Sequence, residues 1–187
     1  MRHKMKEPYR TLLGHFRHET GHYYRGHLVR ETKFLEPYRE LFGNEQNDYT
    51  QALNQYYKLG APANWQQRHI SAYVTAHPWE DWAETWAHFL YIQDALEVAS
   101  DFGLAGKRLF LDPQDKNGKT RLSSKQTTFE EVIGSWSELA VALNSINRRM
   151  GLPDLYLFIL SPIVVANLRF VYEVIVASST RARQNSA

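Results

Sequence analysis

The sequence predicts a mostly α-helical fold with at most a small β-hairpin near residues 109–122. Apolar residues recur at spacings of three and four through most of the chain, which is the period of a helix with one buried face. Glycine stands where four of these periodic stretches stop, at positions 43, 60, 103 and 151. With 187 residues, 43% of them hydrophobic, and neither an internal repeat nor a linker, the chain predicts a single domain over residues 1–187.

The first half of the chain predicts four helices. The first covers residues 8–29 and carries an apolar stripe of Tyr9, Leu12, Leu13, Phe16, Tyr23, Tyr24 and Leu28. The second covers residues 34–42 and is closed by Gly43, and the third covers 48–59 and stops at Gly60. A fourth helix is expected over residues 65–74.

The second half predicts three further helices around one less regular region. Pro78 begins a helix that runs to about residue 102, with acidic residues in its first turn. The pair Asn117-Gly118 is typical of a tight turn and indicates the hairpin near 109–122. Thr127 or Thr128 caps a helix that runs to about residue 150. The last helix begins at Pro162 and ends near residue 177, so that residues 178–187 form a frayed tail.

Composition excludes several classes of function. The net charge is +2 with acids and bases nearly balanced, so no nucleic-acid partner is expected. The chain has no cysteine, which excludes disulfides, a thiolate zinc site and a thiol nucleophile. Residues 155–176 are apolar but contain Arg169 and Glu173, which favours a buried helix over a membrane span. With no signal peptide visible, a cytoplasmic protein without a membrane partner is expected.

The motif H-E-x-x-H at His18, Glu19 and His22 is the strongest functional signal in the sequence. Residues four apart lie on the same side of a helix, one turn along, so two imidazoles can converge on one Zn²⁺ ion. Glu19 lies about 100° round the helix from His18, where it can reach an activated water without binding the metal. Gly21 within the helix is readily explained if another backbone or a substrate comes close.

A catalytic zinc site usually has three protein ligands, and the third lies outside this motif. Positions 25 and 28 are arginine and leucine, which excludes a third histidine on the same helix in the pattern H-E-x-x-H-x-x-G-x-x-H. A second helix offers Glu80 and Glu84 on one face, with His88 continuing that face. One of these carboxylates can bind the metal while the other holds the free ring nitrogen of a ligand histidine. The spacing alone leaves the choice open, and a solvated charged stripe explains it equally well.

The sequence H-E-T-G-H followed by E-D-W-A-E resembles the zincins whose third ligand is a glutamate. It is especially similar to the lethal-factor type of bacterial toxin protease, which carries H-E-F-G-H and then E-F-F-A-E. Residues 7–24, 76–88 and 150–156 more closely resemble a bacterial family described as zinc-binding metallopeptidases, often with an N-terminal cysteine-rich zinc ribbon that this chain lacks. This resemblance covers nearly the whole chain and implies a zincin-like helical domain.

The resemblance also implies roles for individual residues. His18, His22 and Glu80 would bind one Zn²⁺ per chain, with Glu19 as general base and Glu84 supporting a ligand histidine. Tyr73, seven residues before Glu80, would donate a hydrogen bond to the oxyanion. For Tyr73 a place in the core is an equally good interpretation. His88 is expected as a structural or supporting partner of Glu84, and His15 as a residue that lines the cleft or is hydrogen-bonded and partly buried.

These expectations define a zinc metallopeptidase that hydrolyses peptide bonds in a peptide or protein substrate. The alternative is a zinc-binding interaction or structural domain without peptidase activity. The retention of Glu19 favours the enzyme, because a structural zinc site has no use for a base.

Overall fold

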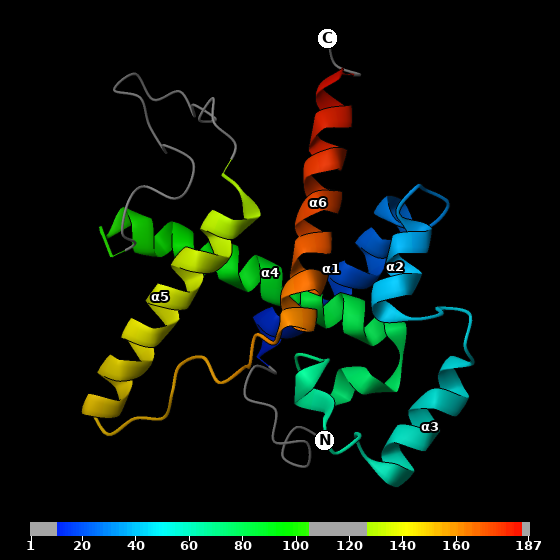
Figure 1. The fold of residues 1–187 in the computed structure, drawn as a ribbon, viewed down its shortest axis with the longest axis horizontal. Coiled ribbons are helices and arrows are strands. Elements are labelled where there is room, and N and C mark those ends of the chain that lie inside the picture. The colour runs from blue at the N-terminus through cyan, green and yellow to red at the C-terminus, as the bar shows by residue number, and fades with distance from the viewer. Residues whose placement is uncertain (1–10, 105–126, 185–187) are drawn as a thin grey trace. The chain divides into compact units, whose positions relative to one another are not determined.

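The computed structural model of the chain describes residues 11–104 and 127–184, and these residues are mostly helical, which confirms the predicted fold class. They contain six α-helices and no strand (Figure 1). The helices are α1 (Leu12–Leu28), α2 (Leu35–Phe42), α3 (Tyr49–Leu59), α4 (Pro78–Asp101), α5 (Phe129–Arg149) and α6 (Pro162–Gln184), with two short 3-10 helices, η2 (Trp65–Gln67) and η3 (Tyr73–Ala76). The predicted hairpin near 109–122 lies outside the described residues.

The chain divides into two compact units, which we describe separately. Unit 1 comprises residues 1–90 and 158–187, and unit 2 comprises residues 91–157. All of the candidate site residues predicted from the sequence belong to unit 1.

Several helix ends follow the local sequence signals. The side chain of Asp48 accepts a hydrogen bond from a backbone amide in the first turn of α3, as expected of an N-cap. Thr128 and Glu131 form a reciprocal capping box at the start of α5. Gly43 and Gly60 terminate α2 and α3 with φ values of 100° and 75°, a conformation that glycine adopts without strain.

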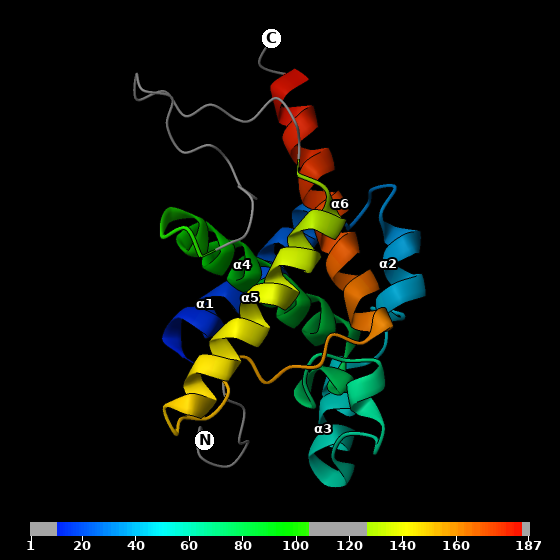
Figure 2. The same cartoon turned by 60° about the vertical axis from the view of Figure 1, so that its left-hand side comes forward.

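Aromatic side chains from three helices form the core of unit 1. Tyr38 and Phe42 on α2 stack at 5.0 Å, and both lie within about 6 Å of Trp82 on α4. Phe170 on α6 contacts Phe42 and Trp82. Leu168, fully buried, adds aliphatic surface from α6. Helices α2 and α6 accordingly lie side by side (Figures 1 and 2), and both apolar faces are removed from water.

Helices α1 and α4 approach closely at Gly21. A Cβ atom placed on Gly21 would lie 2.8 Å from the Cα of Ala83 and 3.1 Å from its carbonyl oxygen. The Nε1–H of Trp82 donates to the Gly21 carbonyl oxygen at 2.8 Å, and the Nε1–H of Trp86 donates to Thr20 Oγ1 at 3.2 Å. The close approach expected from the sequence is therefore to another backbone, and two indole hydrogen bonds fix its register.

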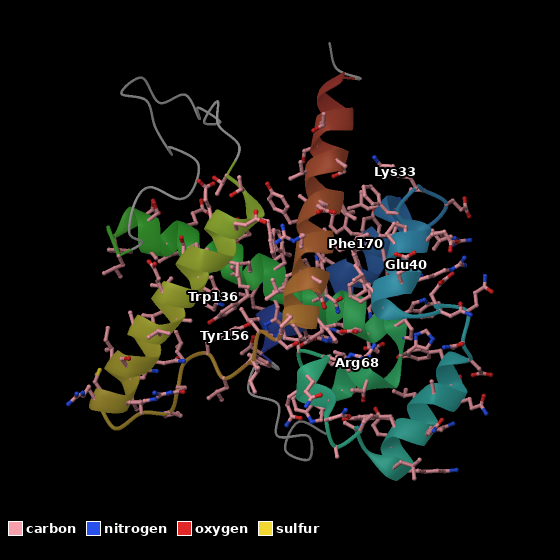
Figure 3. All side chains as sticks on the ribbon, in the orientation of Figure 1. Lys33, Glu40, Arg68, Trp136, Tyr156 and Phe170 are labelled. Carbon is pink, nitrogen blue, oxygen red and sulfur yellow. The ribbon has the colours of Figure 1, made fainter. Side chains whose placement is uncertain are left out.

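Unit 2 is held together by aromatic contacts between α5, the C-terminal part of α4 and the segment after α5. Trp136 and Tyr156 meet edge to face at 4.8 Å (Figure 3). Tyr91 contacts both rings. Asn144 on α5 hydrogen-bonds both the backbone N–H and the carbonyl oxygen of Tyr156. The extended segment is thereby fixed to the helix without secondary structure of its own.

The helix predicted over residues 65–74 is wrong. The structure has η2 and η3 there, separated by irregular chain. Ile70 and Val74 are almost fully buried, and His69 Nδ1 lies 2.9 Å from Asp81 Oδ2 on α4. These tertiary contacts accompany two short 3-10 helices in place of one α-helix, so packing overrides the weak helical pattern.

The apolar stripe predicted on the first helix is present, but it does not form the buried face of α1. Its members in the described residues include five that are 41–77% exposed: Leu12, Leu13, Phe16, Tyr23 and Tyr24. The buried residues of α1 are His18 and Gly21. A polar histidine and a glycine face α4 because the helix is oriented by the site and the close approach, which a hydrophobic pattern does not encode.

The last helix is longer than predicted. Helix α6 continues through Gln184, whereas residues 178–187 were expected to form a frayed tail. The hydroxyl groups of Ser178, Ser179 and Thr180 donate to carbonyl oxygens three or four residues earlier. Such bonds allow hydroxyl residues to remain within a helix.

Within the described ranges, α6 is the one helix that is long and apolar enough to cross a membrane. The stretch Pro162–Thr180 has a mean hydropathy of 1.4. A helix that packs on a protein core passes the same test of length and composition, and α6 buries Leu168, Val171 and Val174 almost completely in unit 1.

We expect Gly21→Ala to destabilise the protein by about 1–3 kcal/mol, because the added methyl group would force α1 and α4 apart. Urea unfolding monitored by circular dichroism measures the change. The matched control is Gly26→Ala on the same helix, where a Cβ meets no atom within 4 Å. That control should be neutral or stabilising by up to about 1 kcal/mol, and equal effects of the two substitutions would contradict the close approach.

Candidate metal centre

Two histidines of α1 face each other at the surface that α1 presents to α4. His18 is 9% exposed, and its Nε2 lies 3.2 Å from Nε2 of His22. Their rings meet edge to face with centroids 4.9 Å apart. Spacing of four residues on one helix therefore brings the two ring nitrogens together, as the sequence predicts.

Glu80 on α4 supplies a carboxylate to the same point. Its Oε2 lies 3.2 Å from His18 Nε2, and its Oε1 lies 3.7 Å from His22 Nε2. Glu80 is 3% exposed. A buried carboxylate is costly unless it is paired or binds a cation. The three residues can offer one ligand atom each, all within 4.8 Å of one another.

This donor set fits zinc. A tetrahedral Zn²⁺ with metal–ligand distances of 2.0–2.1 Å separates its ligand atoms by about 3.3 Å. The separations of 3.2 Å from His18 Nε2 to its two neighbours are close to that value. Two imidazole nitrogens and a carboxylate oxygen also match the ligand types of catalytic zinc sites. His18, His22 and Glu80 would hold the ion.

Glu84, one turn along α4 from Glu80, contacts the other ring nitrogen of His18, Nδ1. Its Oε2 lies 2.8 Å from His18 Nδ1, so the Nδ1–H donates to the carboxylate and Nε2 faces the convergence point. The other oxygen, Oε1, lies 3.7 Å from Nε2 of His88, which is buried and packs edge to face on Phe158. The Glu84 carboxylate is thus held between the imidazoles of His18 and His88.

The carboxylates set the charge state of the centre. Burial alone would lower the pKa of His18, but hydrogen bonds and charge from Glu80 and Glu84 outweigh it and raise that pKa from 6.5 to about 9. For Glu80 and Glu84, burial opposes ionisation, yet the hydrogen bonds with His18 lower both pKa values. Burial lowers the pKa of His22. At neutral pH without metal, His18 carries a proton that compensates the charges of buried Glu80 and partly buried Glu84.

Two other predicted site residues on α1, Glu19 and His15, are exposed to solvent. The side chain of Glu19, the residue after His18, is 56% exposed. His15 is 66% exposed, and its Nε2 lies 3.7 Å from Glu19 Oε1. His15 is therefore a surface partner of Glu19, and the alternative of a partly buried hydrogen-bonded residue is wrong.

Two tyrosines are linked to Glu80 by hydrogen bonds. The sequence singles out only one of them, Tyr73, as a candidate site residue. Tyr73 on η3 is partly buried and hydrogen-bonded to the hydroxyl of Tyr49. The hydroxyl of Tyr49, the first residue of α3, donates to Glu80 Oε1 at 2.9 Å. Tyr49 is 31 residues from Glu80 and belongs to no motif, so only the three-dimensional fold identifies it.

A model of a known protein family covers residues 1–174 of the chain and carries the description "Putative zinc-binding metallo-peptidase". The chain belongs to this family. Three uncharacterized proteins, one from Mycobacterium bovis and two from strains of Mycobacterium tuberculosis, are each 44% identical to it over 176 residues. The matched region covers 94% of this chain and 49% of each relative, so the chain spans about half their length. No solved structure matches it.

For this member of the metallopeptidase family, we expect zinc affinity to rise with pH up to about pH 9. Because the pKa of His18 is raised to about 9 in the metal-free site, its proton must leave before Nε2 can bind a metal. Zinc binding at pH 6.5 should therefore release about one proton. Isothermal titration calorimetry in buffers of different ionisation enthalpy measures the number.

Glu84→Gln is the matched control, because it removes one of the two charges that raise the pKa of His18. Fewer protons should then be released at the same pH. Identical proton release by the two proteins would contradict the assignment to His18.

Proposed function

We propose that the chain is a zinc-dependent metallopeptidase domain of the glutamate-zincin type, similar to the lethal-factor proteases in its ligand arrangement. It binds one Zn²⁺ through His18, His22 and Glu80 and hydrolyses peptide bonds in a peptide or protein substrate. The observation that carries the proposal is the convergence of these three side chains from α1 and α4 beside an exposed glutamate. The chain spans about half the length of its relatives, so peptidase activity is proposed here for this domain. A cytoplasmic location is also part of the proposal.

Zinc, when bound, supplies a Lewis acid that polarises the scissile carbonyl and lowers the pKa of a water molecule. Glu19 accepts the proton of the attacking water and then passes it to the leaving amine. Its exposed position on α1 gives both water and substrate access to the carboxylate. Glu84 keeps the proton of His18 on Nδ1, which leaves Nε2 as the ligand atom.

Tyr73 is the proposed donor to the developing oxyanion, a role that in other hydrolases lowers the barrier by a few kcal/mol. In the resting site its hydroxyl is hydrogen-bonded to Tyr49. The donor role therefore requires this hydroxyl to exchange partners when substrate binds.

Purified protein should contain roughly one zinc per chain, and its melting temperature should fall after chelation, because a ligand that binds only the folded state stabilises it by mass action. Elemental analysis and thermal unfolding before and after chelator treatment measure both quantities. A protein without zinc that also fails to bind added Zn²⁺ would contradict the metal site.

Glu19→Gln should retain zinc and lose about 10²- to 10⁴-fold in the rate of peptide cleavage, because the amide cannot accept a proton. A peptide library analysed by mass spectrometry reports cleavage, and elemental analysis reports zinc. Glu40→Gln, an exposed glutamate on α2, is the matched control and should be unchanged. If the unaltered protein carries zinc but cleaves no library member, the interaction domain becomes the better interpretation.

A further inference from the structure

The two oxygens of Glu80 have different neighbours. Oε2 faces the ring nitrogens of α1, at 3.2 Å from His18 Nε2. Oε1 accepts the hydroxyl proton of Tyr49 at 2.9 Å and lies 3.7 Å from His22 Nε2. A neutral donor therefore already occupies Oε1, whereas Oε2 is the oxygen in contact with His18 Nε2.

Tyr49 is itself held in place on both sides. Its ring stacks on Trp79 at 5.7 Å and meets His77 edge to face at 5.2 Å. Because its own proton goes to Glu80, the Tyr49 hydroxyl can only accept in its hydrogen bond with Tyr73. The hydroxyls thus form a directed chain from Tyr73 through Tyr49 to Glu80.

His77 ties the start of α3 to the start of α4. Its Nε2–H donates to the carbonyl oxygen of Asn47, two residues before α3 begins, and its Nδ1 accepts from the backbone N–H of Trp79. His77 is 2% exposed. Donation at one nitrogen and acceptance at the other fix the orientation of the His77 ring. Because Asn47 is two residues before Tyr49, this hydrogen bond also helps to hold Tyr49 near the start of α4.

We propose that Tyr49 is a positioning residue for the metal centre: its hydroxyl holds Glu80 so that Oε2 alone is presented to the metal. The inference rests on the proposed zinc site. A carboxylate that binds through one oxygen leaves a coordination position for water or substrate, whereas binding through both oxygens would crowd it. Neighbours that orient a metal ligand typically contribute 10- to 100-fold to metal affinity.

If Tyr49 had only a packing role, its substitution by phenylalanine would leave zinc affinity unchanged. Tyr49→Phe keeps the ring that packs on Trp79 and His77 and removes only the hydroxyl. A packing residue would tolerate this change, but a positioning residue would not. Tyr57 on the same helix is 57% exposed, so Tyr57→Phe is the matched control.

The test is a competition titration of Zn²⁺ against a chromophoric chelator, with the unaltered protein, Tyr49→Phe and Tyr57→Phe. We expect affinity to fall about 10- to 100-fold in Tyr49→Phe and to be unchanged in Tyr57→Phe. With Co²⁺ in place of Zn²⁺, the visible absorption of Tyr49→Phe should weaken, since this absorption reports coordination number and Glu80 becomes free to bind through both oxygens.

The outcomes separate this inference from the proposed function. Zinc affinity and a Co²⁺ spectrum in Tyr49→Phe equal to those of the unaltered protein would overturn the positioning role and leave the metal site intact. Failure of the unaltered protein to bind Zn²⁺ would overturn both. Thermal unfolding of the metal-free proteins is the folding control: an affinity loss accompanied by an equal melting temperature supports positioning, and an affinity loss that follows a general loss of folded structure counts against it.

Discussion

The candidate metal centre depends on the close contact of two helix backbones at Gly21 and Ala83. Helix α1 carries both histidines and the candidate base, and α4 carries both carboxylates, so no element alone contains the site. A Cβ atom on Gly21 would lie 2.8 Å from the Cα of Ala83, which leaves no room for any other residue without movement of a helix. Trp82, which donates to the Gly21 carbonyl, fixes how α1 lies along α4. His18 Nε2 lies 3.2 Å from both His22 Nε2 and Glu80 Oε2. The short separation from Glu80 therefore depends on a helix contact made by residues that are not ligands.

Buried charge is the second constraint on this centre. Glu80 is almost fully buried and Glu84 is partly buried, and each forms hydrogen bonds that favour its ionised form. Two carboxylates so placed need a nearby positive charge. Without metal, the protonated His18 provides it. A divalent cation would replace that proton and satisfy the same carboxylates. The site is therefore arranged for a cation, and the hydroxyl of Tyr49 holds the Glu80 oxygen that is not in contact with His18 Nε2.

The sequence predicts those parts of the structure that local physics determines. Helix boundaries at Gly43, Gly60 and Thr128 follow from backbone conformation and capping. The common helix face of His18 and His22, and that of Glu80 and Glu84, follow from helix geometry. Features that depend on tertiary packing are not predictable in this way. The irregular chain around Ile70 is one example, the exposed apolar stripe on α1 is another, and Tyr49 is a third because its distance from Glu80 along the chain has no characteristic spacing. The hydrophobic period of α1 gave the wrong buried face, since the helix is oriented by a histidine and a glycine.

The centre is built from nitrogen and oxygen donors in a chain without cysteine. Thiolate ligands are lost when sulfur is oxidised to a disulfide or to sulfenic acid, and the metal is then released. Imidazole and carboxylate groups do not undergo these reactions. A shift in thiol–disulfide balance would therefore leave these three side chains chemically unchanged, so a metal held by them would not be released by oxidation of a ligand sulfur.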